Sequence, residues 1–230
     1  MSDAVRVLLV GATGLVGQAV LAAAAGRPSL RMVALGRRAA ALPAGAQMEQ
    51  LVIAPDHWPE AVAQVRPGVI VLALGTTIAA VAGDRAAFRA VDHDLTLRCA
   101  TAARQAGTGH AILVSSVGAD PAARAFYLAT KGEVERDVAA LGFARLDVLR
   151  PGLLRGARQG AARPAERLGM AVAPLIDWAL MGDLSRYRSI PAATVGRAIA
   201  NLASAQATGH FVHEFRSIHS AAQGLGHPGG

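Results

Sequence analysis

Short runs of consecutive apolar residues recur along the first two thirds of the chain, separated by longer segments with helical spacing of apolar positions. The runs at residues 5–10 and 69–74 are rich in valine, isoleucine and leucine, which is typical of parallel strands buried on both faces. Together the apolar runs predict strands at residues 5–10, 30–35, 50–53, 69–74, 111–114 and 146–149. Because strands that alternate with helices are joined by right-handed crossovers, the pattern predicts an α/β fold with a doubly wound parallel sheet.

The segments between these runs predict helices at residues 18–25, 57–65, 84–106 and 122–141. Gly107 and Gly142 follow the last two and are typical helix stops. From Leu153 onward the alternation breaks down, and we expect a small C-terminal helical substrate cap over the carboxyl ends of the strands. Residues 1–220 are therefore predicted to form a single domain, with the substrate region from about 153, and residues 221–230 a flexible, glycine-rich tail.

A glycine-rich turn, Gly11-Ala-Thr-Gly14-Leu-Val-Gly17, joins the first predicted strand to the first predicted helix. Phosphates bind at such helix N-termini, where free N–H groups and the helix dipole favour anions. Gly11 permits the tight turn, Gly14 lets the backbone approach a pyrophosphate, and Gly17 lets the helix pack closely on the strand. The spacing is GxxGxxG, one residue wider than GxGxxG, so an ordinary strand-to-helix turn is the alternative. The flanking strand and helix favour a dinucleotide site on a Rossmann fold.

The second predicted strand is followed directly by Gly36, Arg37 and Arg38. Sites that bind NAD usually place Asp or Glu about 20 residues past the glycine turn, on the ribose 2′-hydroxyl. A guanidinium instead pairs with a phosphate through two parallel hydrogen bonds. The two arginines therefore predict NADPH or NADP as the cofactor in preference to NAD, and the alternative is that both are solvated surface residues.

A YxxxK motif, Tyr127-Leu-Ala-Thr-Lys131, lies in the fourth predicted helix. Residues at positions i and i+4 share one helix face, so the ammonium is expected beside the phenol. A neighbouring positive charge stabilises the phenolate, which allows Tyr127 to exchange a proton with a substrate oxygen as hydride moves. Lys131 is also suited to hold the nicotinamide ribose. Ser115 and Ser116 follow the fifth predicted strand, where either hydroxyl can hydrogen-bond the same oxygen.

Lys131 is the single lysine in a chain with 23 lysine and arginine residues, and Tyr127 is one of two tyrosines. A chance spacing of four residues between one lysine and either tyrosine has a probability of roughly 1%. A chain that uses arginine for every other cation keeps lysine where a compact ammonium is needed. The motif therefore indicates a catalytic pair rather than an ordinary surface pair on a helix.

Composition argues against several other classes of protein. Apolar residues make up 53% of the chain and charged residues 17%, which argues against disorder. The net charge is +7, but the arginines are scattered and aromatic residues make up only 4%, so no nucleic acid is expected as a partner. Residues 168–181 are too short to span a bilayer, so no membrane insertion is expected. The one cysteine, Cys99, excludes an internal disulfide, and we expect a cytoplasmic monomer or homodimer.

Several longer stretches match a known superfamily: Gly11-Ala-Thr-Gly14-Leu-Val-Gly17, Leu35-Gly-Arg-Arg38, Leu74-Gly-Thr-Thr77, Val91-Asp92, Ser115-Ser116, Gly118-Ala-Asp120, Tyr127-Leu-Ala-Thr-Lys131-Gly-Glu-Val-Glu135 and Arg150-Pro-Gly152. On these residues the chain resembles the short-chain dehydrogenase/reductase superfamily, and within it the atypical group that includes the Tat-interacting oxidoreductase. The likeness runs from about Val5 to His219. The stretch from Tyr127 to Glu135 is much more specific than YxxxK alone.

The resemblance implies an NADPH-binding Rossmann fold and hydride transfer to or from a small carbonyl or alcohol substrate. It implies Tyr127 as the proton donor or acceptor and Lys131 as a cofactor ligand. The other cofactor contacts that it implies are Thr13, Leu15 and Val16 near the phosphates, Arg37 and Arg38 on the 2′-phosphate, Leu74 and Gly75 with the adjoining Thr76 on the adenosine side, Leu154 at the nicotinamide end, and Arg163. Because Leu15 and Val16 are apolar, their phosphate contacts must come from the backbone.

Two further polar groups are read as structural. Asp92, His93 and Asp94 are adjacent on a predicted helix and point in different directions, so a solvated turn is expected rather than a metal or acid–base cluster. His210 and His213 would lie on opposite faces of a strand, so no metal site is expected. The main hypothesis is an NADPH-dependent oxidoreductase. The alternative is a non-catalytic NADPH-binding sensor or protein-interaction module, because the predicted cap has few polar anchors.

Overall fold

The computed structural model describes residues 4–156 and 182–225. Up to residue 149 the chain alternates strands and helices, as the hydrophobic pattern predicts. The elements of this part are β1 Val5–Val10, α1 Leu15–Ala24, β2 Leu30–Gly36, β3 Glu49–Val52, the 3-10 helix η1 Pro55–His57, α2 Trp58–Val65, β4 Val69–Leu72, α3 Arg85–Arg89, the π-helix η2 Ala90–Leu95, α4 Thr96–Gln105, β5 His110–Val114, α5 Phe126–Ala139 and β6 Arg145–Leu149.

The described elements that follow are β7 Leu154–Arg155, the 3-10 helix η3 Gly182–Tyr187, β8 Ile190–Pro191, α7 Ala192–Leu202, β9 Gly209–His213 and α8 Phe215–Ala222. Strands β7 and β8 form a small two-stranded sheet of their own. Within residues 4–156 and 182–225, none of the helices has the length and apolar character needed to cross a membrane.

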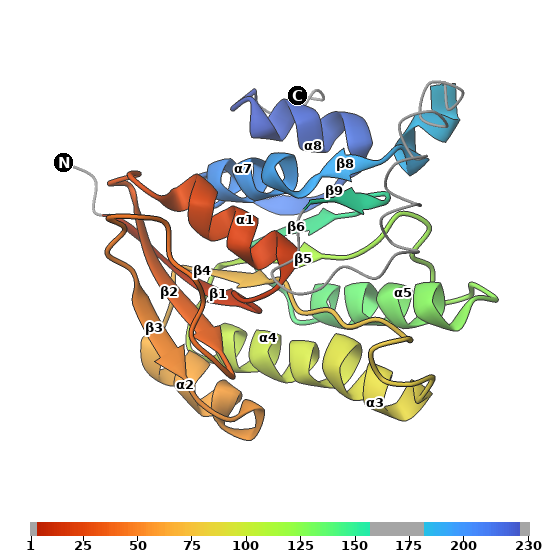
Figure 1. The fold of residues 1–230 in the computed structure, drawn as a ribbon, viewed down its shortest axis with the longest axis horizontal. Coiled ribbons are helices and arrows are strands. Elements are labelled where there is room, and N and C mark those ends of the chain that lie inside the picture. The colour runs from red at the N-terminus through yellow and green to blue at the C-terminus, as the bar shows by residue number, and fades with distance from the viewer. Residues whose placement is uncertain (1–3, 157–181, 226–230) are drawn as a thin grey trace.

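Seven strands form the main sheet in the order β3-β2-β1-β4-β5-β6-β9, and each neighbouring pair is parallel (Figure 1). Strand β1 pairs with β2 from Val5 against Leu30 and with β4 from Val7 against Val69. The strand order therefore reverses between β1 and β4. This arrangement confirms the predicted doubly wound parallel sheet, and ligands bind at such a reversal outside the carboxyl ends of the strands.

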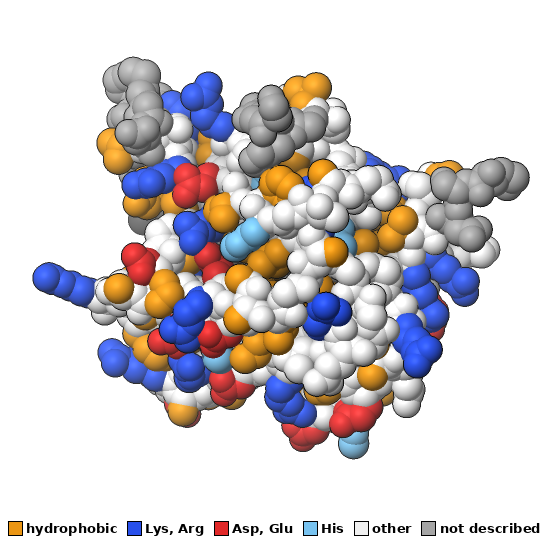
Figure 2. Space-filling view, turned by 180° about the vertical axis from the view of Figure 1, so that it is seen from behind, with side chains coloured by type: hydrophobic (Ala, Val, Ile, Leu, Met, Phe, Trp, Pro, Cys, Tyr) orange, Lys and Arg blue, Asp and Glu red, His pale blue; other side chains and the backbone are white. Residues whose placement is uncertain are grey.

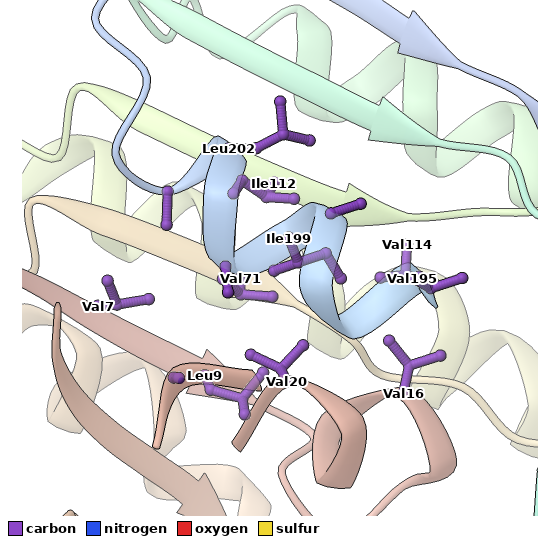
Figure 3. Close-up of a cluster of buried hydrophobic side chains, with 14 of the residues drawn as sticks. Val7, Leu9, Val16, Val20, Val71, Ile112, Val114, Val195, Ile199 and Leu202 are labelled. Carbon is purple, nitrogen blue, oxygen red and sulfur yellow. The ribbon is translucent and has the colours of Figure 1, made fainter. Parts of the chain in front are cut away.

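Helices cover both faces of the sheet: α1 and α7 lie on one face, with α8 packed against α7, and α2, α4 and α5 lie on the other (Figure 1). Side chains of a strand alternate between faces, so each strand serves two cores. Leu9 and Ile112 pack with Val20 of α1 and Ile199 of α7 (Figure 3). Leu8 and its equivalents on the other strands pack towards α2 and α4.

The C-terminal part of the chain contributes more to the core than the sequence analysis expects of a cap. Strand β9 is the seventh strand of the main sheet, and α7 packs directly on α1. Gly196 makes this close packing possible, because a Cβ there would lie 2.4 Å from the carbonyl oxygen of Ala19. The chain after Leu153 therefore supplies one more strand, β9, and one more covering helix, α7, although its hydrophobic pattern does not predict them.

A buried polar cluster joins β5, β6 and β9. The carboxylate of Asp147 lies 2.7 Å from a ring nitrogen of His110 and 2.7 Å from one of His213. It also accepts two hydrogen bonds from Arg145, at 2.6 and 2.9 Å. Burial by itself would raise the pKa of Asp147, but the hydrogen bonds from His110, His213 and Arg145 outweigh it and hold the pKa well below its ordinary value.

Charged side chains on the surface are mixed in sign. On the face drawn in Figure 2, arginines are dispersed among acidic and apolar side chains. One exposed ion pair joins Arg6 to Glu49, with an N–O distance of 3.4 Å.

Candidate functional site

The turn between β1 and α1 is packed so tightly that only glycine fits at two of its positions. Gly11 has a φ of +91°, and a Cβ there would lie 2.6 Å from the carbonyl oxygen of Ala73, just after β4. A Cβ on Gly17 would lie 2.3 Å from the carbonyl oxygen of Gly11. The start of α1 is therefore held against the carboxyl ends of β1 and β4.

Gly14 is the N-cap of α1, and it is exposed and without a side-chain cap. The N–H groups of a first helical turn have no acceptor within the helix. Val16 is 6% exposed and its side chain belongs to the core, so it can offer only its backbone to a phosphate. This open helix N-terminus is a suitable cradle for an anion such as a pyrophosphate.

Arg37 and Arg38 lie next to this cradle. They follow β2, the neighbour of β1, and a Cβ on Gly36 would lie 3.8 Å from the Cγ2 of Thr13 in the turn. Both arginines are exposed, and neither guanidinium forms a hydrogen bond or ion pair with any residue in 4–156 or 182–225. Two uncommitted positive charges therefore stand where the 2′-phosphate of NADP is predicted.

Lys131 is buried and holds a partner that the sequence analysis does not assign. Its Nζ lies 2.8 Å from the Oδ1 of Asp92, and the side chains are 6% and 0% exposed. The other carboxylate oxygen accepts a 2.7 Å hydrogen bond from the backbone N–H of Thr76. Asp92 thus links α5 to the loop after β4, the loop that carries Leu74 and Gly75 of the predicted adenosine side.

The expectation of a solvated turn at Asp92, His93 and Asp94 is wrong for the first two residues. Asp92 is 1% exposed and His93 is 6% exposed, and both lie in the π-helix η2 between α3 and α4. In a π-turn one extra residue changes which side chains face inward, so helical geometry alone does not predict their direction. The signal in the sequence was the single lysine, because a buried ammonium requires a carboxylate.

Tyr127 is in the first turn of α5, one turn before Lys131, and 36% of its surface is exposed. Its ring packs against the fully buried Phe88, with centroids 5.7 Å apart. Phe88 also contacts the ring of Phe126 at 5.7 Å. Phe88 of α3 therefore supports the Tyr127 ring, while part of the ring stays open to solvent.

The two predicted serines differ in accessibility. Ser115 is buried, and its Oγ has no hydrogen-bond partner among the residues that the structure describes. Ser116 is partly exposed, and its Oγ makes only a long contact of 3.4 Å with the carbonyl oxygen of Val117. A hydrogen bond of that length is weak, so the Ser116 hydroxyl is free to take another partner.

The residues after Lys131 anchor α5 at the site. A Cβ on Gly132 would lie 2.2 Å from the backbone of Asp120, so only glycine lets the helix touch the loop after β5. Glu135 is buried and accepts hydrogen bonds from Arg150 at 3.1, 3.1 and 2.5 Å. These bonds raise the pKa of the Arg150 guanidinium against the opposing effect of burial. They tie α5 to the carboxyl end of β6.

The segment around Leu154 crosses from β6 to the start of α1. A Cβ on Gly152 would lie 2.4 Å from the carbonyl oxygen of Arg188, and one on Gly156 would lie 2.8 Å from the Cδ1 of Leu15. Leu154 itself is partly buried against the core under α1 and α7. This places it beside the cradle, where its contact with the nicotinamide end stays a prediction. Arg163 lies outside the described residues.

The structure therefore gathers the predicted residues at the carboxyl ends of β1, β2, β4 and β5 and the start of α5. The contacts that connect them run from Gly11 to Ala73, from Thr76 to Asp92, and from Asp92 to Lys131. Their assignment as cofactor and catalytic residues stays a prediction.

Comparisons with known proteins bear on the family and on the fold. A family model described as NAD(P)H-binding matches residues 11–167, which is more than half of the chain. The chain is 40% identical over 168 residues to "Protein fmp52, mitochondrial" from Aspergillus fumigatus, covering 70% of this chain and 71% of that protein. It is 40% identical over 154 residues to "Protein FMP52, mitochondrial" from Saccharomyces cerevisiae, covering 66% of each.

Solved structures share the fold. "MoeE5 in complex with UDP-glucuronic acid and NAD" superposes with a TM-score of 0.69 at 20% identity, over 90% of this chain and 75% of that chain. The dTDP-4-dehydrorhamnose reductase from Bacillus anthracis in complex with NADP superposes with a TM-score of 0.65 at 14% identity, over 97% of this chain and 82% of that chain.

The relatives correct one expectation and leave another open. Both are named as mitochondrial proteins, so the expectation of a cytoplasmic location is wrong. A single cysteine excludes an internal disulfide in any compartment, so it does not distinguish one location from another. The relatives are named Fmp52, so the narrower likeness to the Tat-interacting oxidoreductase stays a resemblance. With the family model matched from the glycine turn through the Tyr127–Lys131 pair, the chain belongs to the NAD(P)H-binding family.

Proposed function

We propose that the chain is an NADPH-dependent oxidoreductase of the short-chain dehydrogenase/reductase type, acting on a small carbonyl or alcohol substrate. The observation that carries this proposal is the setting of the chain's one lysine. It is buried, paired with a buried carboxylate at 2.8 Å, and one helical turn from a partly exposed tyrosine. Burying two charges costs free energy unless they pair with good geometry. The buried position of Lys131 and Asp92 is therefore not that of an ordinary surface pair on a helix.

The residues fit the cofactor. The open N-terminus of α1 suits a pyrophosphate, and the uncommitted guanidinium groups of Arg37 and Arg38 suit a 2′-phosphate. Asp92 holds the Lys131 ammonium beside the loop that follows β4, where it can donate to a ribose hydroxyl. When bound, the cofactor supplies or accepts the hydride.

The protein's own part in the reaction is proton transfer and orientation. In the reduction, the Tyr127 hydroxyl donates its proton to the substrate oxygen as hydride reaches the carbonyl carbon, and in the oxidation it takes the proton back. We assign the Ser116 hydroxyl to the same substrate oxygen, because it is accessible and weakly bonded whereas the Ser115 hydroxyl is buried. Ser116→Ala should then lower turnover more than Ser115→Ala.

Replacing Tyr127 by phenylalanine is expected to abolish turnover while leaving NADPH binding intact. The change removes only the hydroxyl, and general acid–base catalysis is worth about 10²–10⁴ in rate. The measurement is NADPH oxidation with a panel of aldehydes and ketones, alongside calorimetric titration of NADPH. The matched control is Tyr187→Phe, the other tyrosine. If the wild-type protein binds NADPH and turns over none of the panel, the non-catalytic sensor or interaction module becomes the better account.

Replacing Arg37 or Arg38 by alanine should weaken NADPH binding roughly tenfold or more and change NADH binding little. A hydrogen bond to a charged group contributes about 1.5–3 kcal/mol, and NADH has no 2′-phosphate to receive one. Calorimetric titration of both cofactors measures the difference. Arg31→Ala is the control, because Arg31 is an exposed arginine at the opposite end of the same strand. Equal losses for both cofactors would contradict the assignment.

A further inference from the structure

His93 is buried between two carboxylates. Its Nδ1 lies 2.8 Å from the Oδ1 of Asp94 on its own segment, and its Nε2 lies 2.8 Å from the Oδ2 of Asp137 on α5. Neutral imidazole carries one N–H, and an ionised carboxylate can only accept. The protonated ring alone can therefore donate to both partners at once.

Other charged groups surround this arrangement from each side. Arg89 of α3 lies 3.9 Å from Asp94 and is also paired with Glu133 of α5. Arg136 lies 2.8 Å from Asp137. Hydrogen bonds from Arg136 and from His93 lower the pKa of Asp137, against the opposing effect of its partial burial. Asp137, the carboxylate of α5 that faces His93, is therefore held in the ionised form that accepts from it.

The position of His93 connects it to the candidate site. It directly follows Asp92, so two adjacent residues of η2 both reach α5. The Asp92 carboxylate contacts the Lys131 ammonium, and the His93 ring contacts the Asp137 carboxylate, so the two contacts have opposite polarity. Helix α5 runs beside the α3–α4 segment that contains η2 (Figure 1). Because the two residues are adjacent, the contact that holds His93 on α5 also helps to fix the position of Asp92 beside Lys131.

We propose that His93, in its imidazolium form, is a positioning residue that clamps η2 to α5 and thereby keeps Asp92 aligned on Lys131. Loss of its proton removes one of the two hydrogen bonds that His93 donates and loosens the clamp. The proposal rests on the proposed function for its catalytic consequence, because Lys131 is there assigned to the cofactor. It adds a dependence of that site on the charge of a residue that does not touch it.

The test compares His93→Gln, which is uncharged at every pH, with His93→Arg, which is always a cation and can donate to both carboxylates. The readouts are kcat, KM and the dissociation constant of NADPH between about pH 6 and 9, the range in which histidine changes charge. At low pH, kcat in His93→Gln should be about tenfold below wild type. The ratio of kcat between wild type and His93→Gln should approach one as the pH rises. The ratio of kcat between His93→Arg and His93→Gln should stay constant.

Ratios between variants cancel any pH dependence that all of them share. His57→Gln is the control, because His57 is an exposed histidine. A ratio of wild type to His93→Gln that does not change with pH would overturn the proposal, because a merely structural role predicts a constant difference. If the wild-type protein shows no turnover, the proposed catalysis fails on its own. The ratio of the NADPH dissociation constants of wild type and His93→Gln then replaces the ratio of kcat. A change of this ratio with pH supports the role of His93, and a constant ratio overturns it.

Discussion

Lys131→Arg is expected to lower turnover by on the order of 10²-fold or more, although it keeps the positive charge. The Lys131 side chain is 6% exposed, and its Nζ meets a fully buried carboxylate at 2.8 Å. A guanidinium is planar and larger than an ammonium, so it cannot occupy this space without displacing Asp92 or the turn of α5. Steady-state kinetics with an accepted carbonyl compound, together with NADPH titration, measure the effect.

The matched control for this prediction is Arg98→Lys, an exchange of the same two residue types at an exposed position of α4. It should be silent in both measurements. Circular dichroism and urea unfolding establish that Lys131→Arg is folded. Full activity of a folded Lys131→Arg would contradict the assigned role of the ammonium, and would favour binding of NADPH without turnover.

Asp147→Ala is expected to lower the free energy of unfolding by about 3–5 kcal/mol, because it leaves the Arg145 guanidinium buried without its partner. The Asp147 side chain is fully buried and contacts Arg145, His110 and His213. Urea unfolding at neutral pH measures the loss. Glu49→Ala is the control, since it breaks the exposed ion pair with Arg6 and should cost less than about 1 kcal/mol. If Asp147→Ala and Glu49→Ala lowered the free energy of unfolding by similar amounts, the buried cluster would stabilise the fold no more than an exposed ion pair does.

The contribution of Asp147 also has a defined pH dependence. Its pKa is lower in the folded chain than in the unfolded chain, so its ionised form stabilises the fold. This contribution is fully present above the unfolded value of about 3.9 and is lost as the pH falls from there towards the folded value. The stability difference between wild type and Asp147→Asn should therefore be present at neutral pH and shrink below about pH 4. A difference that grows on acidification would contradict this linkage.

The local elements follow from the order of the amino acids, and so do the parts of the candidate site that lie close together along the chain. The apolar runs predict β1, β2, β4, β5 and β6, because a strand buried on both faces needs a nearly continuous apolar run. Strand β3 lies at the edge of the sheet and is only partly buried, so its run is shorter and less apolar. The turn at Gly11 and Gly17 and the spacing from Tyr127 to Lys131 are local signals of the same kind. Each of them follows from the period of a helix or strand and from the space that a glycine leaves.

The polar partners meet only in the folded chain, because they come from distant parts of the sequence. His93 meets Asp137 across 44 residues of sequence, and His213 meets Asp147 across 66. Asp92 turns inward because η2 is a π-helix, which a 3.6-residue period does not reveal. Strand β9 joins the sheet after a stretch without alternation, and its pairing with β6 brings His213 to the cluster. A buried charge is stable only beside a partner that neutralises it, and the fold brings that partner from a distant part of the chain.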